Sequence, residues 1–211
     1  MGLGIRLLGW CLVTLALPGC TVTAGGLAAA PARVRPWSPP LVEAHAVLLD
    51  LDSMRGITGG GPELNIIPSM DTAYPVDIEA LADQTPPPCR FLFAETATFG
   101  AAIDDFHKVS YQYPPRAGLI SQAAAVYTDP PTARKVFEDL SQQATDCGRT
   151  PFGRTYLGAV NSDDESLRTR SGDCGRDYRL KAVVLAEVTF CGFGESVPQI
   201  VLTNLLRGVP G

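Results

Sequence analysis

Apolar residues recur at helical spacing in three stretches of the chain, and each stretch predicts a helix. The first begins at Ser38-Pro39-Pro40, a favourable helix start, and ends near Gly56. The second follows Asp129-Pro130-Pro131, where aspartate is the N-cap and proline opens the helix, and ends near Gly148. The third spans residues 196–207. The apolar residues on these predicted faces are Leu41, Ala44, Val47, Leu48, Leu51 and Met54, then Ala133, Val136, Phe137, Leu140, Ala144 and Cys147, then Val197, Ile200, Val201 and Leu205.

Other stretches of the chain show the two-residue alternation, or the mixture of apolar and polar residues, that is typical of strands. Residues 106–113 alternate in polarity, and 119–127 follow a proline-rich connector, so we expect an antiparallel hairpin. In the last third of the chain we expect strands over 154–160, 166–171 and a long pair within 174–191. Removal of residues 1–19 would leave 192 residues, which is enough for one domain with a sizeable core, and we assign that domain to 41–211.

The amino terminus has the pattern of an export signal. Arg6 precedes an apolar run from Leu7 to Leu17, which is shorter than the roughly 20 apolar residues that span a bilayer. The run ends in Leu17-Pro18-Gly19-Cys20, which resembles the lipobox of bacterial lipoproteins, whose cysteine is diacylated on sulfur and becomes the mature terminus. We therefore expect residues 1–19 to be a lipoprotein signal peptide and Cys20 to carry the lipid.

Residues 20–40 are rich in Ala, Gly, Pro and Thr, and this composition predicts a flexible tether. The tether would hold a folded domain at the cell membrane, on the extracytoplasmic side, with the membrane as its first partner. Ala28-Ala29-Ala30 offers a second cleavage pattern, which would release a soluble secreted protein instead.

Charge and cysteine content narrow the class of protein. The net charge is −5 and becomes −6 when Arg6 leaves with the signal, so a nucleic-acid partner is not expected. Four cysteines follow Cys20, and an even number in an exported chain indicates two disulfides, with three possible connectivities. Their spacing fits no zinc site. These cysteines are Cys89, Cys147, Cys174 and Cys191.

The predicted elements favour one of the three connectivities. Cys147 lies at the core-facing end of the second helix, where it can reach Cys89 after the three prolines. Cys174 and Cys191 become cross-strand neighbours if the chain turns near 181–183, within reach of a disulfide. We therefore predict the pairs Cys89–Cys147 and Cys174–Cys191.

Taken together, these features resemble the PknH-like extracellular sensor domain, over residues 41–207. The features are an anchor and tether, a helix from Leu41, the Gln122–Tyr127 stretch before a helix that ends in cysteine, and a Cys-strand-Cys-Gly hairpin with a final helix. The family includes the outer part of a mycobacterial Ser/Thr kinase and stand-alone mycobacterial lipoproteins. The resemblance implies an α+β fold, in which helices pack against an antiparallel β-sheet closed by two disulfides. It also implies a cleft proposed to bind an unidentified ligand.

Residue types that carry catalysis are scarce. No G-x-S-x-G motif occurs, and His45 and His107 are more often surface or structural histidines than bases. The acidic groups at 50 and 52, 104 and 105, and 163–165 lack the pattern of a calcium loop. We therefore predict no catalytic residue, no metal and no cofactor.

A binding role is the remaining interpretation. If a cleft exists, the exposed tips of Tyr111 and Tyr113, with Gln122, are the first candidates for its polar groups; core packing is the alternative for these tyrosines. The sequence thus predicts a non-catalytic lipoprotein that binds a small molecule, a lipid, a glycan or a peptide. The alternatives are an adaptor that binds another envelope protein and, third, a hydrolase.

Overall fold

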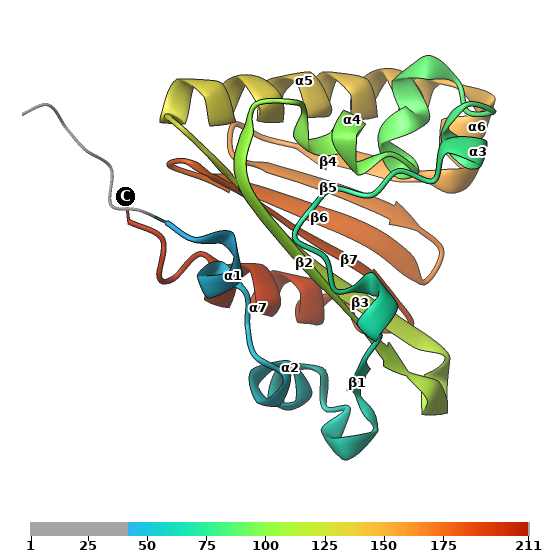
Figure 1. Cartoon of the computed structure of the whole chain (residues 1–211). Helices are drawn as coiled ribbons and strands as arrows, with labels where there is room; N and C mark the ends of the chain where they lie inside the picture. The colour runs from blue at the N-terminus through green and yellow to red at the C-terminus, as the bar shows by residue number, and fades with distance from the viewer. Residues whose placement is uncertain (1–41, 211) are drawn as a thin grey trace, which may run out of the picture. The chain divides into compact units, whose positions relative to one another are not determined.

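A seven-stranded antiparallel sheet organises residues 42–210, the part of the chain that the computed structural model describes (Figure 1). The strand order is β1-β2-β3-β7-β6-β5-β4. The α+β fold with an antiparallel sheet is therefore confirmed. The expected signal peptide (1–19), tether (20–40), lipid site Cys20 and second cleavage site near Ala30 lie outside the described residues. The strands are β1 (Asn65–Ile66), β2 (Ile103–Tyr113), β3 (Gly118–Tyr127), β4 (Ala159–Ser162), β5 (Ser166–Ser171), β6 (Cys174–Lys181) and β7 (Val184–Cys191).

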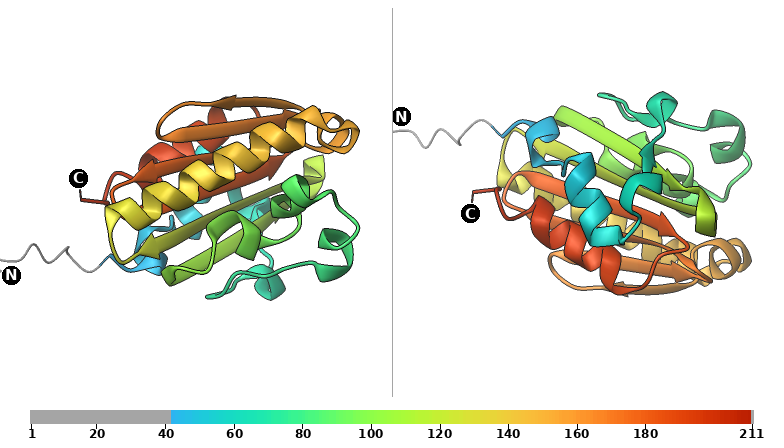
Figure 2. Two further views of the ribbon diagram at one scale, coloured as in Figure 1. Left: turned by 90° about the horizontal axis from the view of Figure 1, so that it is seen from above. Right: turned by 90° about the horizontal axis from the view of Figure 1, so that it is seen from below.

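Helices cover both faces of the sheet (Figure 2). Helix α5 (Pro130–Arg149) crosses one face, here named the α5 face. Helix α7 (Ser196–Leu205) packs on the other, here named the α7 face, together with α1 (Ala44–Val47) and α2 (Leu51–Thr58). The short elements are η1 (Gly61–Glu63), η2 (Pro68–Met70), α3 (Glu79–Ala82), η3 (Pro87–Leu92), α4 (Glu95–Phe99), η4 (Pro114–Arg116) and α6 (Pro151–Tyr156).

Each face of the sheet carries its own apolar core, because successive strand residues point to opposite sides. On β2 and β3, Phe106 and Ala123 belong to the core under α5, whereas Tyr111 and Ile120 belong to the core against α7. The aspartate cap predicted for α5 is confirmed, since Asp129 accepts a hydrogen bond from the backbone N–H of Thr132 at 2.8 Å.

The prediction of one continuous first helix is wrong. The chain forms α1, breaks at Leu48–Asp50 and starts again as α2. Asp50 is the N-cap of α2, because its side chain accepts from the Ser53 N–H at 2.7 Å. The backbone of Leu49 bonds to the side chain of Gln122, which replaces helical bonding at the break.

The prediction of a strand over residues 154–160 is also wrong, because its first half is helical. Helix α6 follows α5 directly, and Thr150 caps it by accepting from the Gly153 N–H at 2.9 Å. Only glycine fits at position 153, since a Cβ there would lie 1.9 Å from the carbonyl oxygen of Cys147. Strand β4 begins after this helix and pairs with β5.

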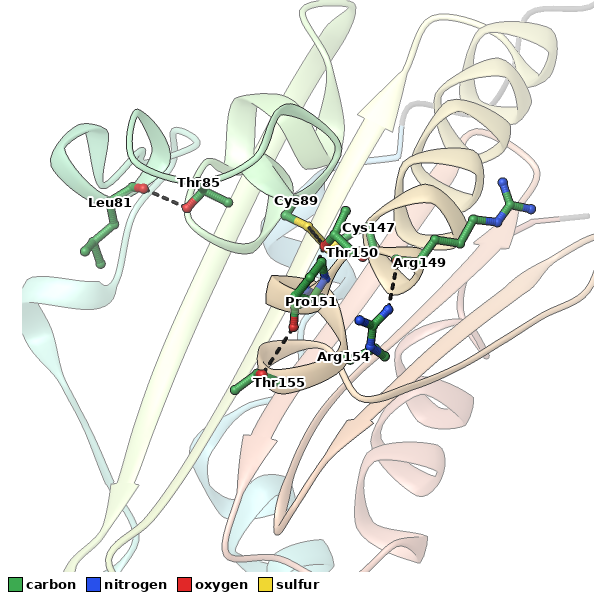
Figure 3. Close-up of a disulfide and its surroundings, with 10 residues drawn as sticks. Leu81, Thr85, Cys89, Cys147, Arg149, Thr150, Pro151, Arg154 and Thr155 are labelled. Carbon is green, nitrogen blue, oxygen red and sulfur yellow. Dashed lines mark hydrogen bonds between the residues drawn. A yellow bond between two sulfur atoms is a disulfide. The ribbon is translucent and has the colours of Figure 1, made fainter.

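The two predicted disulfides, Cys89–Cys147 and Cys174–Cys191, are confirmed. The first joins η3 to the end of α5, beside the Thr150 cap (Figure 3). The second joins paired positions of β6 and β7, whose turn includes Ala182 at φ +50°. Within residues 42–210, no helix has the length and apolarity to cross a membrane.

Candidate functional site

Polar side chains gather on the half of the α5 face that α5 does not cover. They come from four adjacent strands, at positions that alternate with residues of the other core. The strand register aligns them in two rows across the sheet: Lys108, Ala123, Glu187 and Tyr178 in one row, and Ser110, Ser121, Thr189 and Arg176 in the next.

Five members of these rows form the floor of a cavity of about 250 Å³, whereas Ala123, Tyr178 and Ser110 do not line it. Its walls come from two segments that lie over the sheet. One is residues 69–78, here named the strap, and the other is residues 91–95, from the end of η3 to the start of α4. The wall residues are mainly apolar, whereas the floor is polar and charged. Those used below are Met70, Val76, Ile78 and Phe93 in the walls, and Lys108, Ser121, Arg176, Glu187 and Thr189 in the floor.

Polar contacts fix the strap to its neighbours. Thr72 and Lys108 exchange backbone hydrogen bonds at 2.9 and 3.0 Å. Glu95 accepts from the Val76 N–H at 2.8 Å, and Asp77 accepts from the Thr96 N–H at 3.0 Å. Backbone and carboxylate hydrogen bonds therefore hold the strap against β2 and α4.

The charged groups of the cavity are balanced. Lys108 forms an ion pair with Glu95. The side chain of Lys108 is 19% exposed and that of Glu95 is 14% exposed. Arg176 donates to the carbonyl oxygens of Phe91 and Leu92, at 3.3 and 2.6 Å, and so ties β6 to the wall. Glu187, on the adjacent strand β7, accepts a hydrogen bond from the Thr189 hydroxyl. The lining therefore contains two cationic and two anionic side chains.

Two buried hydroxyls in these rows have no hydrogen-bond partner within residues 42–210. They belong to Tyr178 and Ser110, both 0% exposed. Burial raises the pKa of the Tyr178 hydroxyl, and the charge of Glu187 raises it further, so the group stays a donor at neutral pH. Burial by itself would lower the pKa of the Arg176 guanidinium. Electrostatic attraction to Tyr178 and Glu187 outweighs this effect, and the pKa is raised.

A second hollow, of about 220 Å³, adjoins the first. The two share Leu92, Phe93, Arg176 and Thr189. The second extends toward Tyr156 of α6 and Phe190 of β7. Arg176 thus lines both hollows.

The residues proposed from sequence for a cleft lie elsewhere. Tyr111 is 1% exposed and Gln122 is 0% exposed, and both belong to the α7 side of the sheet. The Gln122 amide donates to the Leu49 carbonyl at 2.6 Å and to the Tyr111 hydroxyl at 2.8 Å. The expectation of an exposed tip is therefore wrong for Tyr111, because its hydroxyl and Gln122 fasten the break between α1 and α2. Tyr113 packs near Phe193, with ring centroids 6.2 Å apart.

Sequence reasoning missed the floor residues, although a signal was present. Lys108 and Ser110 fall on the same side of β2 as Phe106, and Glu187 and Thr189 interrupt an otherwise apolar strand. Charged residues on the inward side of central strands indicate either ion pairs or a site. That pattern, read across both hairpins, would have located the cavity.

The two histidines and the acidic groups also take structural positions. His107 is 3.0 Å from Asp71 through Nε2, and its ring lies edge-on to His45 at 5.0 Å. Asp105 accepts from the Ala44 N–H at 2.7 Å, and Asp163 closes the β4–β5 turn by accepting from the Ser166 N–H at 2.7 Å. Among residues 42–210, no group of three metal-ligating side chains comes together.

Comparison with known proteins identifies a family for this fold. The family described as PknH-like extracellular domain matches residues 42–203. No curated protein matches the chain in sequence. The crystal structure of the extracellular domain of PknH from Mycobacterium tuberculosis is similar, with a TM-score of 0.62 and 13% sequence identity. The similarity covers 82% of this chain and 98% of that one, and at this identity it shows the fold alone.

Proposed function

The chain belongs to the PknH-like extracellular domain family, and from that premise we propose that it is a lipid-anchored envelope protein that binds a ligand without catalysis. A family of extracellular domains supports an extracytoplasmic location. The lipobox-like stretch that ends in Cys20 supports the lipid anchor. The proposed binding site is the cavity between the strap and the sheet.

The observation that carries this proposal is the polarity of the cavity floor. Burying polar and charged side chains costs stability, so a face kept only for packing would be apolar. Here the sheet lines the cavity with polar and charged side chains, which are Lys108, Ser121, Arg176, Glu187 and Thr189. Apolar walls with a few convergent polar groups are typical of ligand sites.

The non-catalytic part of the proposal follows from the identity of the lining residues. Neither histidine nor cysteine occurs among them. Glu95 is engaged by Lys108 and by the Val76 N–H, and Glu187 by the Thr189 hydroxyl. The remaining charged group, Arg176, is always protonated in proteins and cannot act as a base. The lining therefore offers recognition groups and lacks the histidine or thiolate that most often activates or supplies a nucleophile.

Native mass spectrometry of the protein purified from its own envelope tests the binding proposal. We expect a small molecule to remain bound to the wild type and to be lost from Glu187→Gln, which keeps the shape of the side chain. Ile200→Ser, on α7 and 44% exposed, is the matched control and should keep the molecule. Recovery of the wild type with protein partners and without a small molecule would contradict ligand binding.

Intact-mass analysis of the same sample tests the anchor. We expect loss of residues 1–19 and the added mass of acyl chains on Cys20, and neither change in Cys20→Ala. An unmodified chain cleaved near Ala30 would contradict the anchor and leave the binding proposal in place.

One observation favours the adaptor as a second candidate. Four apolar side chains of the strap and of the following helix α3 are exposed: Tyr74 at 77%, Val76 and Ile78 at 53%, and Leu81 at 44%. Exposed apolar patches commonly mark protein interaction sites. An adaptor would lose its protein partner in Tyr74→Ser and keep it in Glu187→Gln, whereas a ligand-binding protein depends on Glu187.

A further inference from the structure

We propose that the cavity binds an amphiphile with a neutral, hydroxyl-rich headgroup, of which a sugar is the simplest example, and an apolar tail that lies along the strap. This inference rests on the proposed function and adds the chemical class of the ligand. Three features carry it: the balance of charge in the lining, the mixture of free donors and acceptors, and the position of the apolar wall.

The balance of charge argues against a charged headgroup. Lys108 is paired with Glu95, and Arg176 lies one strand away from Glu187. A headgroup with a net charge would enter a partly buried space whose own charges already compensate each other, and it would stay uncompensated there. A neutral headgroup avoids this cost.

The unused hydrogen-bonding capacity is of both kinds. Lys108 and Arg176 are the cationic donors in the lining. Arg176 carries five N–H groups, of which its contacts to Phe91 and Leu92 occupy only a part. Glu187 and Thr189 add oxygen acceptors. A hydroxyl both donates and accepts, so adjacent hydroxyls on one headgroup can satisfy all of these groups.

The volume of the cavity places the tail outside it. A cavity of about 250 Å³ is below the range of about 300–1,000 Å³ that holds a drug-sized molecule, so it has room for a headgroup only. Val76 and Ile78 line the cavity and are each 53% exposed, so they form an apolar path from its interior to its mouth. Tyr74, on the same strap and 77% exposed, prolongs the apolar surface.

Titration with single-chain amphiphiles below their micelle concentrations tests the inference. The probes share an eight-carbon tail and are octyl glucoside, the zwitterion octylphosphocholine and the anion octyl phosphate, with glucose as the headgroup without a tail. The protein is the full chain carrying Cys20→Ser, which removes the proposed anchor, and binding is measured by calorimetry. We expect octyl glucoside to bind more tightly than the two phosphate-containing amphiphiles and than glucose.

Matched variants locate the bound molecule. Ile78→Ser removes an apolar contact with the tail and is expected to weaken octyl glucoside binding about tenfold, whereas Ile200→Ser on α7 leaves it unchanged. Glu187→Gln is expected to weaken binding by a similar factor. Thr189→Val provides a second change in the floor if Glu187→Gln does not fold, as judged by its thermal unfolding.

Each alternative outcome has a defined meaning. Equal or tighter binding of a charged amphiphile, sensitive to the Ile78 and Glu187 changes, would overturn the neutral headgroup and leave the proposed function intact. Binding that Ile200→Ser weakens and Ile78→Ser does not would overturn the path of the tail. Absence of binding by all probes would overturn the inference; the proposed function falls as well only if native mass spectrometry also finds no small molecule.

Discussion

The two halves of the α5 face are built from the same strands and differ in what covers them. Under α5 the strands present apolar residues such as Ala125 and Leu185, and the helix seals them with Phe137 and Leu140. Under the strap the same strands present Ser121 and charged or hydroxyl groups. The contrast teaches that a long amphipathic helix requires an apolar surface, whereas a strap fixed by polar contacts can cover a cavity.

Two buried tyrosines on this face of the sheet differ in how their hydroxyls are satisfied. Tyr127 is 2% exposed and donates its hydroxyl to the Phe99 carbonyl at 2.8 Å. Tyr178, in the same row as Lys108 and Glu187 but outside the cavity lining, is 0% exposed, and its hydroxyl has no partner within residues 42–210. A substitution of each tyrosine therefore removes a different interaction.

The largest expected effect comes from the disulfide that joins the two halves. Cys89–Cys147 ties η3, a wall of the cavity, to α5, and it closes 58 residues of chain. Replacing both cysteines by alanine should lower the free energy of unfolding by about 4 kcal/mol in the loop-entropy account. The control is the Cys174–Cys191 pair, which closes 17 residues and should cost about 3 kcal/mol. Urea unfolding measures both, and a reversed order would contradict this assignment.

The next effect separates core packing from the strap. Leu140→Ala, on α5 and 0% exposed, should lower the free energy of unfolding by about 2–5 kcal/mol because it opens a void in the sealed half. Ile78→Ala, on the strap and 53% exposed, should change it by less than about 0.5 kcal/mol. If urea unfolding showed that the two variants lose similar amounts of unfolding free energy, the strap would belong to the core.

The smallest effect concerns the two tyrosines. Tyr127→Phe removes a satisfied hydrogen bond and should cost about 1 kcal/mol of unfolding free energy. Tyr178→Phe removes an unpaired hydroxyl and should cost nothing or add up to about 1 kcal/mol, because the desolvation penalty disappears. Thermal unfolding of the two variants gives the comparison. A loss of stability in Tyr178→Phe as large as that in Tyr127→Phe would mean that its hydroxyl is satisfied within the protein.

The closed half was predictable from sequence, and the reason is periodicity. Helix α5, its Asp129 cap and the hairpin from Cys174 to Cys191 follow from residues that interact within one element or across one turn. The Cys89–Cys147 pair spans 58 residues, and it was predicted from the position of Cys147 at the core-facing end of its helix.

The cavity was not predictable in that way, because it depends on contacts between distant segments. Arg176 meets the carbonyls of Phe91 and Leu92 across more than eighty residues, and Lys108 meets Glu95 from another element. The break between α1 and α2 likewise depends on Gln122, which is 73 residues from Leu49 in sequence. Sequence showed these side chains to be polar, and the register of four strands brought them together.

Contacts between octyl glucoside and the protein, observed as intermolecular nuclear Overhauser effects, test the central claim most directly. The full chain carrying Cys20→Ser and labelled at its isoleucine, leucine and valine methyl groups would be used. We predict contacts from the octyl chain to the Val76 and Ile78 methyl groups, and none to Leu140 under α5 or to Ile200 on α7. Contacts confined to Ile200, or spread evenly over exposed methyl groups, would contradict the claim that the strap half of the α5 face is the ligand site.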